Sequence, residues 1–225
     1  MSAERIPPPA PEARAPLDTS ALVAFERVVR GRRSVRRFRP EPLAAESLDR
    51  ILEAGLWAPS PHGTQPWRFV VITHALNRSR LADAMADNWR HNLEMDGEPP
   101  EVVAGRLAGS RRRLLEAPAL VLVCLYTAEL EDYPDPARAA AEQTMAVQSL
   151  GACVQTMLLT AYALGVDAGW MCAPLFCPEI VVAALDLAPQ LTPHGLLAIG
   201  HAAADPKRRP RRPLETLVVW DDRRL

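Results

Sequence analysis

A short basic segment carries residues whose types and spacing suit anion binding. In an extended chain, Arg32, Ser34 and Arg36 lie on one side, because successive side chains alternate. Guanidinium groups make strong, charge-assisted and bidentate hydrogen bonds to phosphate, and the hydroxyl between them adds a further donor. The same arginine-rich run, up to Arg39, could also be a solvated loop or a nucleic-acid contact. Taken alone, the segment does not separate these interpretations.

A second basic segment follows near the end of the chain. It contains Lys207, Arg208, Arg209, Arg211 and Arg212, and it comes after an apolar stretch that ends at Gly200. Its prolines favour an extended backbone. The segment could therefore place an arginine against the same phosphate, or it could be a solvated tail.

A third element is a polar loop bounded by prolines, over residues 58–66. His62, Thr64 and Gln65 could form hydrogen bonds with a planar polar ring, whereas Trp67 is expected to pack in the core. Two arginine groups together with a stiff polar loop fit a flat cofactor that carries a phosphate.

The elements that position these residues can be read from the apolar periodicity. We expect helices over residues 18–31, 44–57, 137–164 and 178–187, and a helical excursion over 79–115 that is interrupted at Gly97, Pro99 and Pro100. We expect strands over residues 67–73, 119–126, 166–172, 195–201 and 216–220. The long helix over 137–164 is apolar nearly all round, which predicts a central core helix and suits a dimer contact. Residues 1–17 are rich in proline and predict a disordered arm, which leaves residues 18–225 as a single α+β or α/β domain.

Composition narrows the class of protein. Hydrophobic residues make up 48% and charged residues 24%, as in folded soluble domains. A net charge of -1 provides no global field for nucleic acid or an anionic membrane. No apolar run is long enough to cross a bilayer, and no signal peptide is evident, so we expect a cytoplasmic protein.

Common alternative sites are not indicated. The four cysteines form no C-x-x-C pair, and no two histidines have metal-binding spacing, so we expect neither disulfides nor a metal. The sequence lacks G-x-G-x-x-G and G-x-x-x-x-G-K-[ST], so neither a Rossmann site nor a common NTPase loop is predicted.

The order of the motifs resembles a known family. R-x-S-x-R-x-F, then P-S-x-x-x-x-Q-P-W-R-F about twenty residues later, and a late R-R-P-L-E are similar to the FMN-binding nitroreductase superfamily, over about residues 24–222. The resemblance implies a nitroreductase-like three-layer α+β fold, with a central mixed or antiparallel sheet flanked by helices. It also implies an intertwined homodimer that holds FMN between its subunits.

The resemblance assigns roles to the basic residues. Arg32 and Ser34, with Arg33 beside them, would bind the FMN phosphate, and Arg36 would lie at the pyrimidine edge of the isoalloxazine. Arg211 or Arg212 would complete the phosphate site. No catalytic side chain is implied, because the flavin carries the chemistry.

Two other segments would contact the ring. Many relatives have Asn at the position of Gly63, so a backbone group, His62 or Gln65 would replace that contact here. The backbone over Cys172, Ala173, Pro174 and Leu175 aligns with the stretch that passes near flavin N5. Pro174 has no N–H, so the donor would come from a neighbouring residue. Glu142, Gln143 and Gln148 could face the partner's flavin or solvent.

A closer resemblance suggests a substrate. Segments 132–135, 175–178 and 193–201, and the Trp89-containing helix followed by Asp96 and Gly97, are similar to the C-terminal flavin domain of the bifunctional F-420 biosynthesis protein. This likeness implies ping-pong hydride transfer from NAD(P)H or a reduced deazaflavin to a dehydro precursor of coenzyme F-420. A broad NAD(P)H-dependent nitro or quinone reductase, and a non-catalytic flavin or deazaflavin carrier, remain alternatives.

Overall fold

The computed structural model describes residues 16, 18–206 and 208–219. Contacts between Cα atoms divide the chain into residues 1–31 and residues 32–225, and each unit is described by itself. Most of the predicted arm, residues 1–15 and 17, lies outside the described residues.

The first unit contains helix α1 (Thr19–Gly31), which confirms the predicted helix. It begins where the Asp18 carboxylate accepts hydrogen bonds from the Ala21 N–H and the Ser20 hydroxyl, both at 2.7 Å. These bonds lower the pKa of Asp18, because they favour its charged form.

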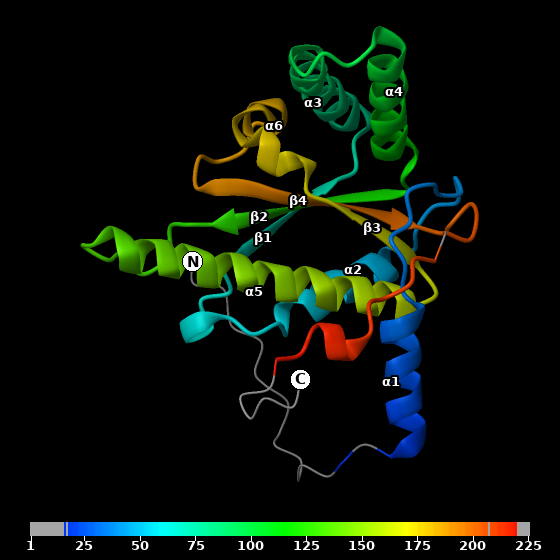
Figure 1. Cartoon of the computed structure of the whole chain (residues 1–225), viewed down its shortest axis with the longest axis vertical. Helices are drawn as coiled ribbons and strands as arrows, with labels where there is room; N and C mark the ends of the chain where they lie inside the picture. The colour runs from blue at the N-terminus through cyan, green and yellow to red at the C-terminus, as the bar shows by residue number, and fades with distance from the viewer. Residues whose placement is uncertain (1–15, 17, 207, 220–225) are drawn as a thin grey trace. The chain divides into compact units, whose positions relative to one another are not determined.

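The second unit is built on one antiparallel sheet. Its strands are β1 (Trp67–Ile72), β2 (Ala119–Tyr126), β3 (Asp167–Met171) and β4 (Leu191–Gly200), in the order β1-β2-β4-β3 (Figure 1). β2 is central and nearly all of it is buried, as its continuous apolar run predicts. β4 begins four residues earlier than expected, at Leu191, because pairing with β2 extends across Pro193.

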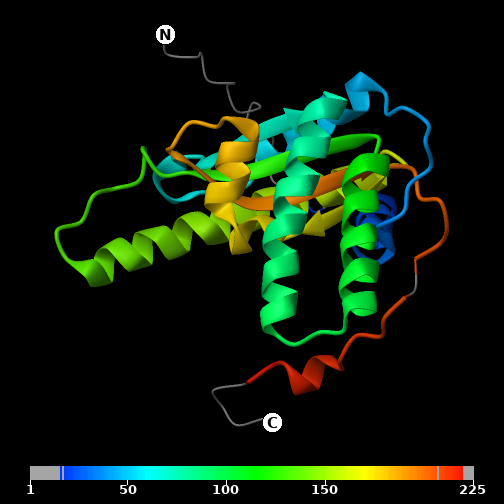
Figure 2. The ribbon, with the colours of Figure 1, turned by 90° about the horizontal axis from the view of Figure 1, so that it is seen from above.

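Helices cover both faces of this sheet, which confirms the three-layer prediction. α2 (Ala45–Leu56) and α5 (Pro136–Ala163) cover one face, and α3 (Ala75–Met95), α4 (Pro100–Glu116) and α6 (Pro178–Leu185) cover the other (Figures 1 and 2). Alternate β2 residues divide between the two layers: Val121 and Val123 belong to the core on the α5 side, and Leu120 and Leu122 to the core on the α3 side.

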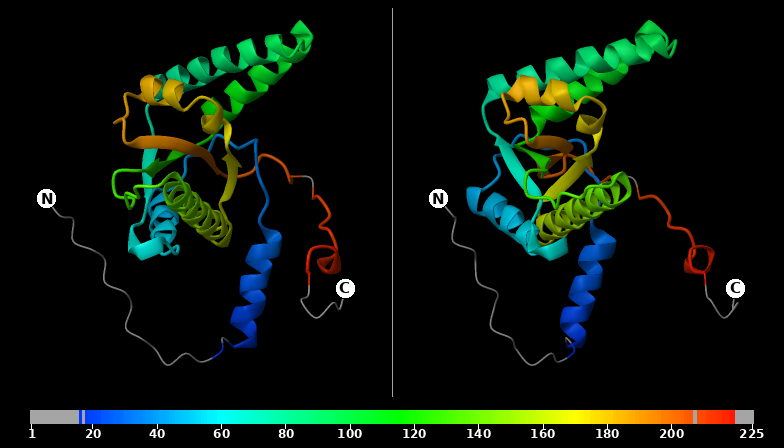
Figure 3. Two further views of the ribbon diagram at one scale, coloured as in Figure 1. Left: turned by 60° about the vertical axis from the view of Figure 1, so that its left-hand side comes forward. Right: turned by 90° about the vertical axis from the view of Figure 1, so that its left-hand side faces the viewer.

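The predicted helical excursion is a hairpin of α3 and α4. The chain reverses at Gly97, whose φ of 74° is readily adopted by glycine, and Pro99 and Pro100 start α4. Figure 3 shows this hairpin extending away from the sheet. Arg78 ties its two ends together, because its guanidinium donates to the carbonyls of Ile72, Ala117 and Pro118.

Helix α5 differs from its prediction in how it is buried. It starts at an Asp135 cap that accepts a 2.9 Å bond from the Arg138 N–H, and the chain leaves it through Gly165, with a φ of 74°. Only one stripe of the helix is buried along its first half, where Met145 and Val147 are 36% and 38% exposed. The first half is therefore not the all-round core helix that its composition predicts.

The last predicted strand is wrong over the residues that the structure describes. Residues 214–216 form a 3₁₀ turn, η3 (Leu214–Thr216), and residues 217–219 pair with no strand of the described chain. Residue 220 lies outside the described residues. A β-branched run forms a strand only where a neighbouring strand supplies hydrogen bonds, and here Leu214, Leu217 and Val219 stay 73%, 60% and 82% exposed.

The four cysteines are free thiols. Burial raises the pKa of Cys124 and Cys153 to about 12. Among the described helices, none is both long and apolar enough for a membrane span.

Candidate functional site

The N-terminal basic segment lies against the outer edge of β3. Ser34 forms a parallel bridge with Ala168, and the Val35 N–H donates to the Ala168 carbonyl at 3.0 Å. A Cβ on Gly169 would lie 2.1 Å from the Val35 carbonyl oxygen, so only glycine permits this close approach. Val35 is buried, while Ser34 and Arg36 on either side of it are exposed.

The structure brings a late arginine to this segment. Burial lowers the pKa of Arg32, and the positive charges of Arg211 and Arg33 lower it further. We call Arg32, Arg33, Ser34 and Arg211 the phosphate corner. Guanidinium groups held near one another repel, and an anion between them removes that cost. Of the two arginines that the sequence left open, both are exposed, and Arg211 is the one whose charge acts on Arg32.

A second arginine pair was not predicted. Burial lowers the pKa of Arg113, in the last turn of α4, and the charge of Arg36 lowers it further. The Arg113 Nε is buried and has no hydrogen-bond partner in the described part of the chain. A buried donor of this kind calls for an acceptor from outside the chain.

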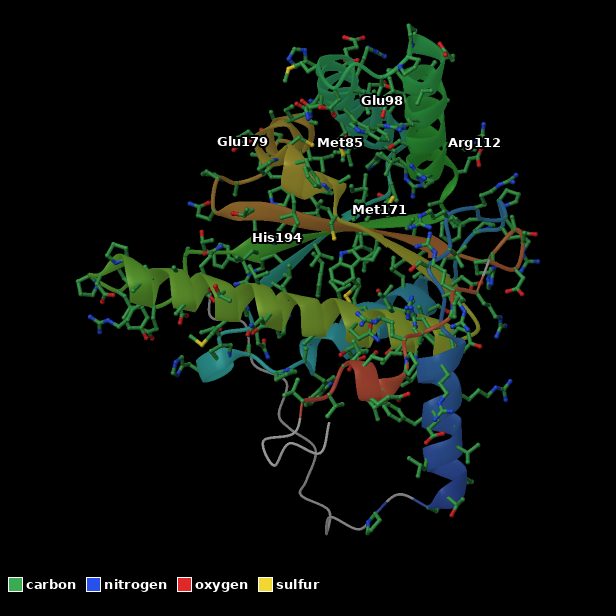
Figure 4. The ribbon with its side chains drawn as sticks, in the orientation of Figure 1. Met85, Glu98, Arg112, Met171, Glu179 and His194 are labelled. Carbon is green, nitrogen blue, oxygen red and sulfur yellow. The ribbon has the colours of Figure 1, made fainter. Side chains whose placement is uncertain are left out.

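The neighbours of Arg113 have ordinary partners. Arg111 pairs with Asp83 at 2.9 Å, and Arg112 lies 3.8 Å from Glu116 on the outer side of α4 (Figure 4). The sequence shows only three consecutive arginines, so the position of Arg113 six residues before β2 was the one signal that could have singled it out.

The polar loop contains an unusual backbone. His62 and Gly63 in its 3₁₀ turn η1 (Pro61–Gly63) have φ values of 53° and 66°, and Gln65 after the turn has a φ of 50°. Non-glycine residues in this region cost about 1 kcal/mol or more each, and such strain gathers at functional sites. The Thr64 hydroxyl donates to the Pro61 carbonyl, and the Gln65 N–H donates to the Ser60 hydroxyl, both at 3.0 Å.

A cavity of about 340 Å³ opens beside this loop. Its walls are formed by the first part of the loop and by one stripe of α5, with Pro59, Ser60, Pro61, Met145, Gln148, Ser149 and Ala152 as lining residues. Gln148 therefore faces a cavity, and Gln143 is exposed. Glu142 is only 3% exposed and is not one of the residues that line the cavity. Its carboxylate accepts a long hydrogen bond of 3.5 Å from the Glu131 N–H.

The segment after β3 forms a second 3₁₀ turn, η2 (Ala173–Phe176). Cys172, Ala173 and Leu175 are exposed, while Pro174 is buried. The Leu175 N–H already donates to the Cys172 carbonyl at 3.1 Å. Of the backbone donors that the sequence allowed here, Cys172 and Ala173 are the better placed to bind a ligand.

A bulge in β4 lies beside this turn. The register with β2 shifts between Val123 and Cys124, so His194 is an extra residue in the ladder, and Trp170 lies over Gly195. Burial lowers the pKa of His194, which Figure 4 marks on β4, with Met171 at the end of β3.

Strand directions show which parts lie together. Trp67 and Tyr126 are at one end of the sheet, and Ile72 and Ala168 at the other, while Met171 is level with Leu196 in the middle. The phosphate corner and η2 thus lie at the two ends of the β3 edge, about 15 Å apart for a strand of this length. The loop before β1 lies on the opposite edge, about 14 Å across the sheet. The loop and the phosphate corner of one chain are therefore too far apart to contact the same ring of a bound ligand.

These features define a three-layer α+β protein in which two arginines, Arg32 and Arg113, are each influenced by a second positive charge. The chain belongs to the nitroreductase family: the model described as "Nitroreductase family" matches residues 29–201.

Relatives and solved structures agree with this membership. A protein named NADH dehydrogenase from Thermus thermophilus is 31% identical over 204 residues, covering 84% of this chain and 92% of that protein. A 5,6-dimethylbenzimidazole synthase from Rhodospirillum rubrum is 29% identical over 212 residues, with 92% and 93% covered. A Desulfovibrio desulfuricans protein described as a nitroreductase, solved in complex with FMN, has a TM-score of 0.66 at 28% identity, with 88% and 96% covered.

Proposed function

We propose that this chain is an FMN-dependent oxidoreductase that takes a hydride from NAD(P)H and passes it to a planar organic acceptor. The observation that carries the proposal is the buried Arg113 Nε, which has no acceptor in the described chain, together with the like charges of Arg36 near Arg113 and of Arg211 near Arg32. In each pair one member, Arg32 or Arg113, is partly buried and the other is exposed. A solvated basic loop does not require like charges held in this way, whereas a phosphorylated ring with polar edges does.

The phosphate corner would hold the FMN phosphate. Arg32 and Arg211 would provide charge, and the exposed Ser34 hydroxyl would provide a third donor. The backbone there is fixed by the bond between Val35 and Ala168, so these groups are positioned before a ligand arrives.

Arg36 and Arg113 would lie at the pyrimidine edge of the flavin. The buried Arg113 Nε fits this role, because it has a hydrogen to donate and no acceptor in the described chain. When bound, FMN supplies a ring that accepts a hydride and releases it to an acceptor. Two guanidinium groups at the ring's carbonyl edge stabilise the negative charge that the reduced ring gains.

The turn η2 would contact the other side of the ring, near N5. The Cys172 or Ala173 N–H is the backbone donor that we assign there, because Pro174 has none and the Leu175 N–H is already bonded. No side-chain nucleophile is needed.

A homodimer would complete the site. The loop with His62, Gly63 and Gln65 lies at the opposite edge of the sheet from the phosphate corner, so a partner's loop, with its α5 cavity, is the copy that would face this flavin. Met145, which lines that cavity, and Val147 are exposed on α5 and suit burial against a second copy. In this proposal residues 18–225 act as one FMN-binding domain.

The specific acceptor that we propose is the dehydro precursor of coenzyme F-420. Support comes from the sequence segments 132–135, 175–178 and 193–201, which are similar to the flavin domain of the F-420 biosynthesis protein. A broad nitro or quinone reductase shares the same site and differs only in its acceptor.

Purification with bound flavin followed by anaerobic turnover tests the proposal. We expect a yellow protein whose FMN absorption is bleached by NAD(P)H and restored by an acceptor. A colourless protein that FMN cannot reconstitute contradicts the proposal, and bound flavin that no donor bleaches indicates a carrier. An acceptor panel of dehydro-F-420, quinones and nitroaromatics then identifies the substrate.

A further inference from the structure

One half-buried histidine has no role in the proposed FMN contacts. His194 lies in β4, and its ring has no hydrogen-bond partner in the part of the chain that the structure describes. Burial lowers its pKa below the ordinary value of 6.5, so the imidazole is neutral near pH 7. A neutral imidazole has one N–H to donate, and here that donor is left over for a ligand.

The backbone of β4 is irregular at this residue. On either side of it, β4 pairs with β2 through Pro193 with Cys124 and through Gly195 with Val123. The two β2 residues belong to opposite core layers, so the regular alternation of β4 side chains stops at His194. A bulge of this kind redirects a side chain, and bulges are frequent beside active sites.

His194 lies near the turn that we assign to flavin N5. β3 and β4 are antiparallel, and their ladder ends with Met171 opposite Leu196 (Figure 4). Beyond this pair β3 continues into η2, β4 runs back to His194, and η2 packs against β4. Adjacent antiparallel strands are about 5 Å apart, so the backbone of Cys172 and Ala173 passes within about 5–10 Å of His194.

Exposed apolar side chains flank this histidine. A Cβ on Gly195 would lie 2.5 Å from Trp170 Nε1, so the indole lies directly against the residue next to His194. Trp170 is 37% exposed, and in η2 Leu175 and Phe176 are 47% and 81% exposed. Apolar groups around an unused polar group are typical of sites for flat organic molecules. These surroundings therefore suit the ring of the acceptor.

We propose that His194 is a catalytic residue of the acceptor half-reaction, in which its imidazole N–H donates a hydrogen bond to a carbonyl oxygen of the acceptor. This inference rests on the proposed function and names the acceptor class as conjugated carbonyl compounds. The acceptor takes up a hydride, with its electron pair, at a carbon conjugated with the carbonyl group. The π bond at that carbon breaks, and its electrons move onto the oxygen.

The flavin is oxidised in this step and the acceptor is reduced, and solvent then supplies one proton to the acceptor. His194 keeps its own proton throughout, because a neutral imidazole is a hydrogen-bond donor rather than an acid. A donor held at the oxygen stabilises the negative charge that develops there.

Separate measurement of the two half-reactions in the flavin-loaded enzyme tests this role. In His194→Met, we expect reoxidation of the reduced flavin by menadione to slow by about tenfold or more, because the donor at the oxygen is lost. Bleaching by NAD(P)H, the FMN content and reoxidation by ferricyanide, which takes up single electrons and no hydride, should stay unchanged. His194→Gln retains an N–H donor and should recover most of the rate.

His74→Met is the matched control. His74 is exposed and precedes α3, at the Ile72 end of the sheet. Its replacement removes an imidazole of the same kind outside the proposed acceptor site, so neither half-reaction should change.

NMR of the imidazole gives a readout that does not depend on turnover. In oxidised protein with ¹⁵N-labelled histidine, the ring signals that are missing from His194→Gln identify His194. We expect these signals to show a neutral ring and to shift when menadione is added without NAD(P)H. The signals of His74 should not shift.

Three results would overturn the inference. They are equal slowing of both half-reactions in His194→Met, an unchanged rate with menadione, and His194 signals that menadione does not shift. If His194→Met fails to fold, the rate of His194→Gln and the wild-type titration still decide. Loss of FMN from a folded His194→Met would assign His194 to the cofactor site, and so overturn the inference while leaving the proposed function intact. Absence of FMN in the wild-type protein would instead contradict the proposed function.

Discussion

Two groups of arginines in this molecule have opposite surroundings. On the α3–α4 hairpin, Arg90, Arg106 and Arg111 each lie within 3 Å of a carboxylate, at 2.9, 2.8 and 2.9 Å. By contrast, the charge of Arg211 acts on Arg32 beside β3, and the charge of Arg36 acts on Arg113 in the last turn of α4, so each pair consists of like charges. The residue type is the same in both regions. The presence or absence of a counter-charge separates arginines that serve the fold from those that we propose bind a ligand.

The contrast is sharpest within three consecutive residues. Arg111 and Arg112 pair with Asp83 and Glu116, while Arg113 turns inward with a buried, unsatisfied Nε. Helical rotation of about 100° per residue is enough to send neighbours to different environments. A run of arginines in a sequence is therefore not one functional unit.

The largest expected effect comes from emptying the phosphate corner. In Arg32→Ala/Arg211→Ala, two charge-assisted contacts of about 1.5–3 kcal/mol each are lost, so we expect FMN affinity to fall by about 100-fold or more. Flavin titration of the apoprotein measures this. The apoprotein should unfold at the same or a higher temperature, since repulsion between the two charges is removed. A large fall in apoprotein stability would contradict the view that these arginines serve a ligand rather than the fold.

The next test displaces the basic segment over residues 32–36 from β3 without changing its arginines. Gly169→Ala places a methyl group 2.1 Å from the Val35 carbonyl oxygen, so the segment must move. We expect a loss of stability of about 1–3 kcal/mol, together with weaker FMN binding. Denaturant unfolding and flavin titration measure the two effects. The matched control is Gly105→Ala on α4, where nothing lies within 4 Å of the added Cβ, and which should be neutral or slightly stabilising.

Removing the unpredicted arginine should affect the flavin more than the fold. In Arg113→Met, we expect about a tenfold loss of FMN affinity and a lower flavin reduction potential, because a positive charge near the reduced ring is lost. Spectroelectrochemistry of the loaded protein measures the potential. Arg112→Met, one residue away, should change neither quantity, and equal effects of the two substitutions would remove the distinction between them.

The smallest effect is expected on the hairpin. Arg111→Ala removes an exposed pair and should cost at most about 0.5–1 kcal/mol, with no change in flavin binding. Arg111 holds the pKa of Asp83 below its ordinary value of 3.8, first through a hydrogen bond. A carboxyl group whose pKa is lower in the folded state stabilises the fold at pH values above its ordinary pKa of 3.8. The difference in free energy of unfolding between wild type and variant should therefore vanish as the pH falls below 3.8. Urea unfolding across that pH range measures it, and a difference that grew in acid would refute the assignment.

The sequence predicted most elements, because their signals are local. β2 was predicted with its bounds, and α2 and α5 to within about a residue at each end, since apolar spacing, prolines and caps lie inside the segments themselves. The basic segment over 32–39 and the late arginines were also singled out by their composition. The structure adds that the charge of Arg211 acts on Arg32.

Features that depend on distant partners were missed. Arg113 acquires its role from Arg36, which is 77 residues earlier in the chain, and no local pattern connects the two. The bulge at His194 follows from pairing with β2, and the expected strand over 216–220 has no partner in the described chain. Such elements are decided by tertiary hydrogen bonds, which a single sequence does not display.

The Arg78 side chain determines which part of the α3–α4 hairpin can vary. It holds the carbonyls of Ile72, Ala117 and Pro118 together, and so fastens the base of the whole α3–α4 excursion with one guanidinium group. Residues between these anchor points can change in length and composition while β1 and β2 keep their register. Apart from Arg113, which belongs to the arginine-lined site, the excursion is thus a module that can be exchanged, and new acceptors can be accommodated by changing the rest of the hairpin while Arg32, Arg36 and Arg211 stay in place.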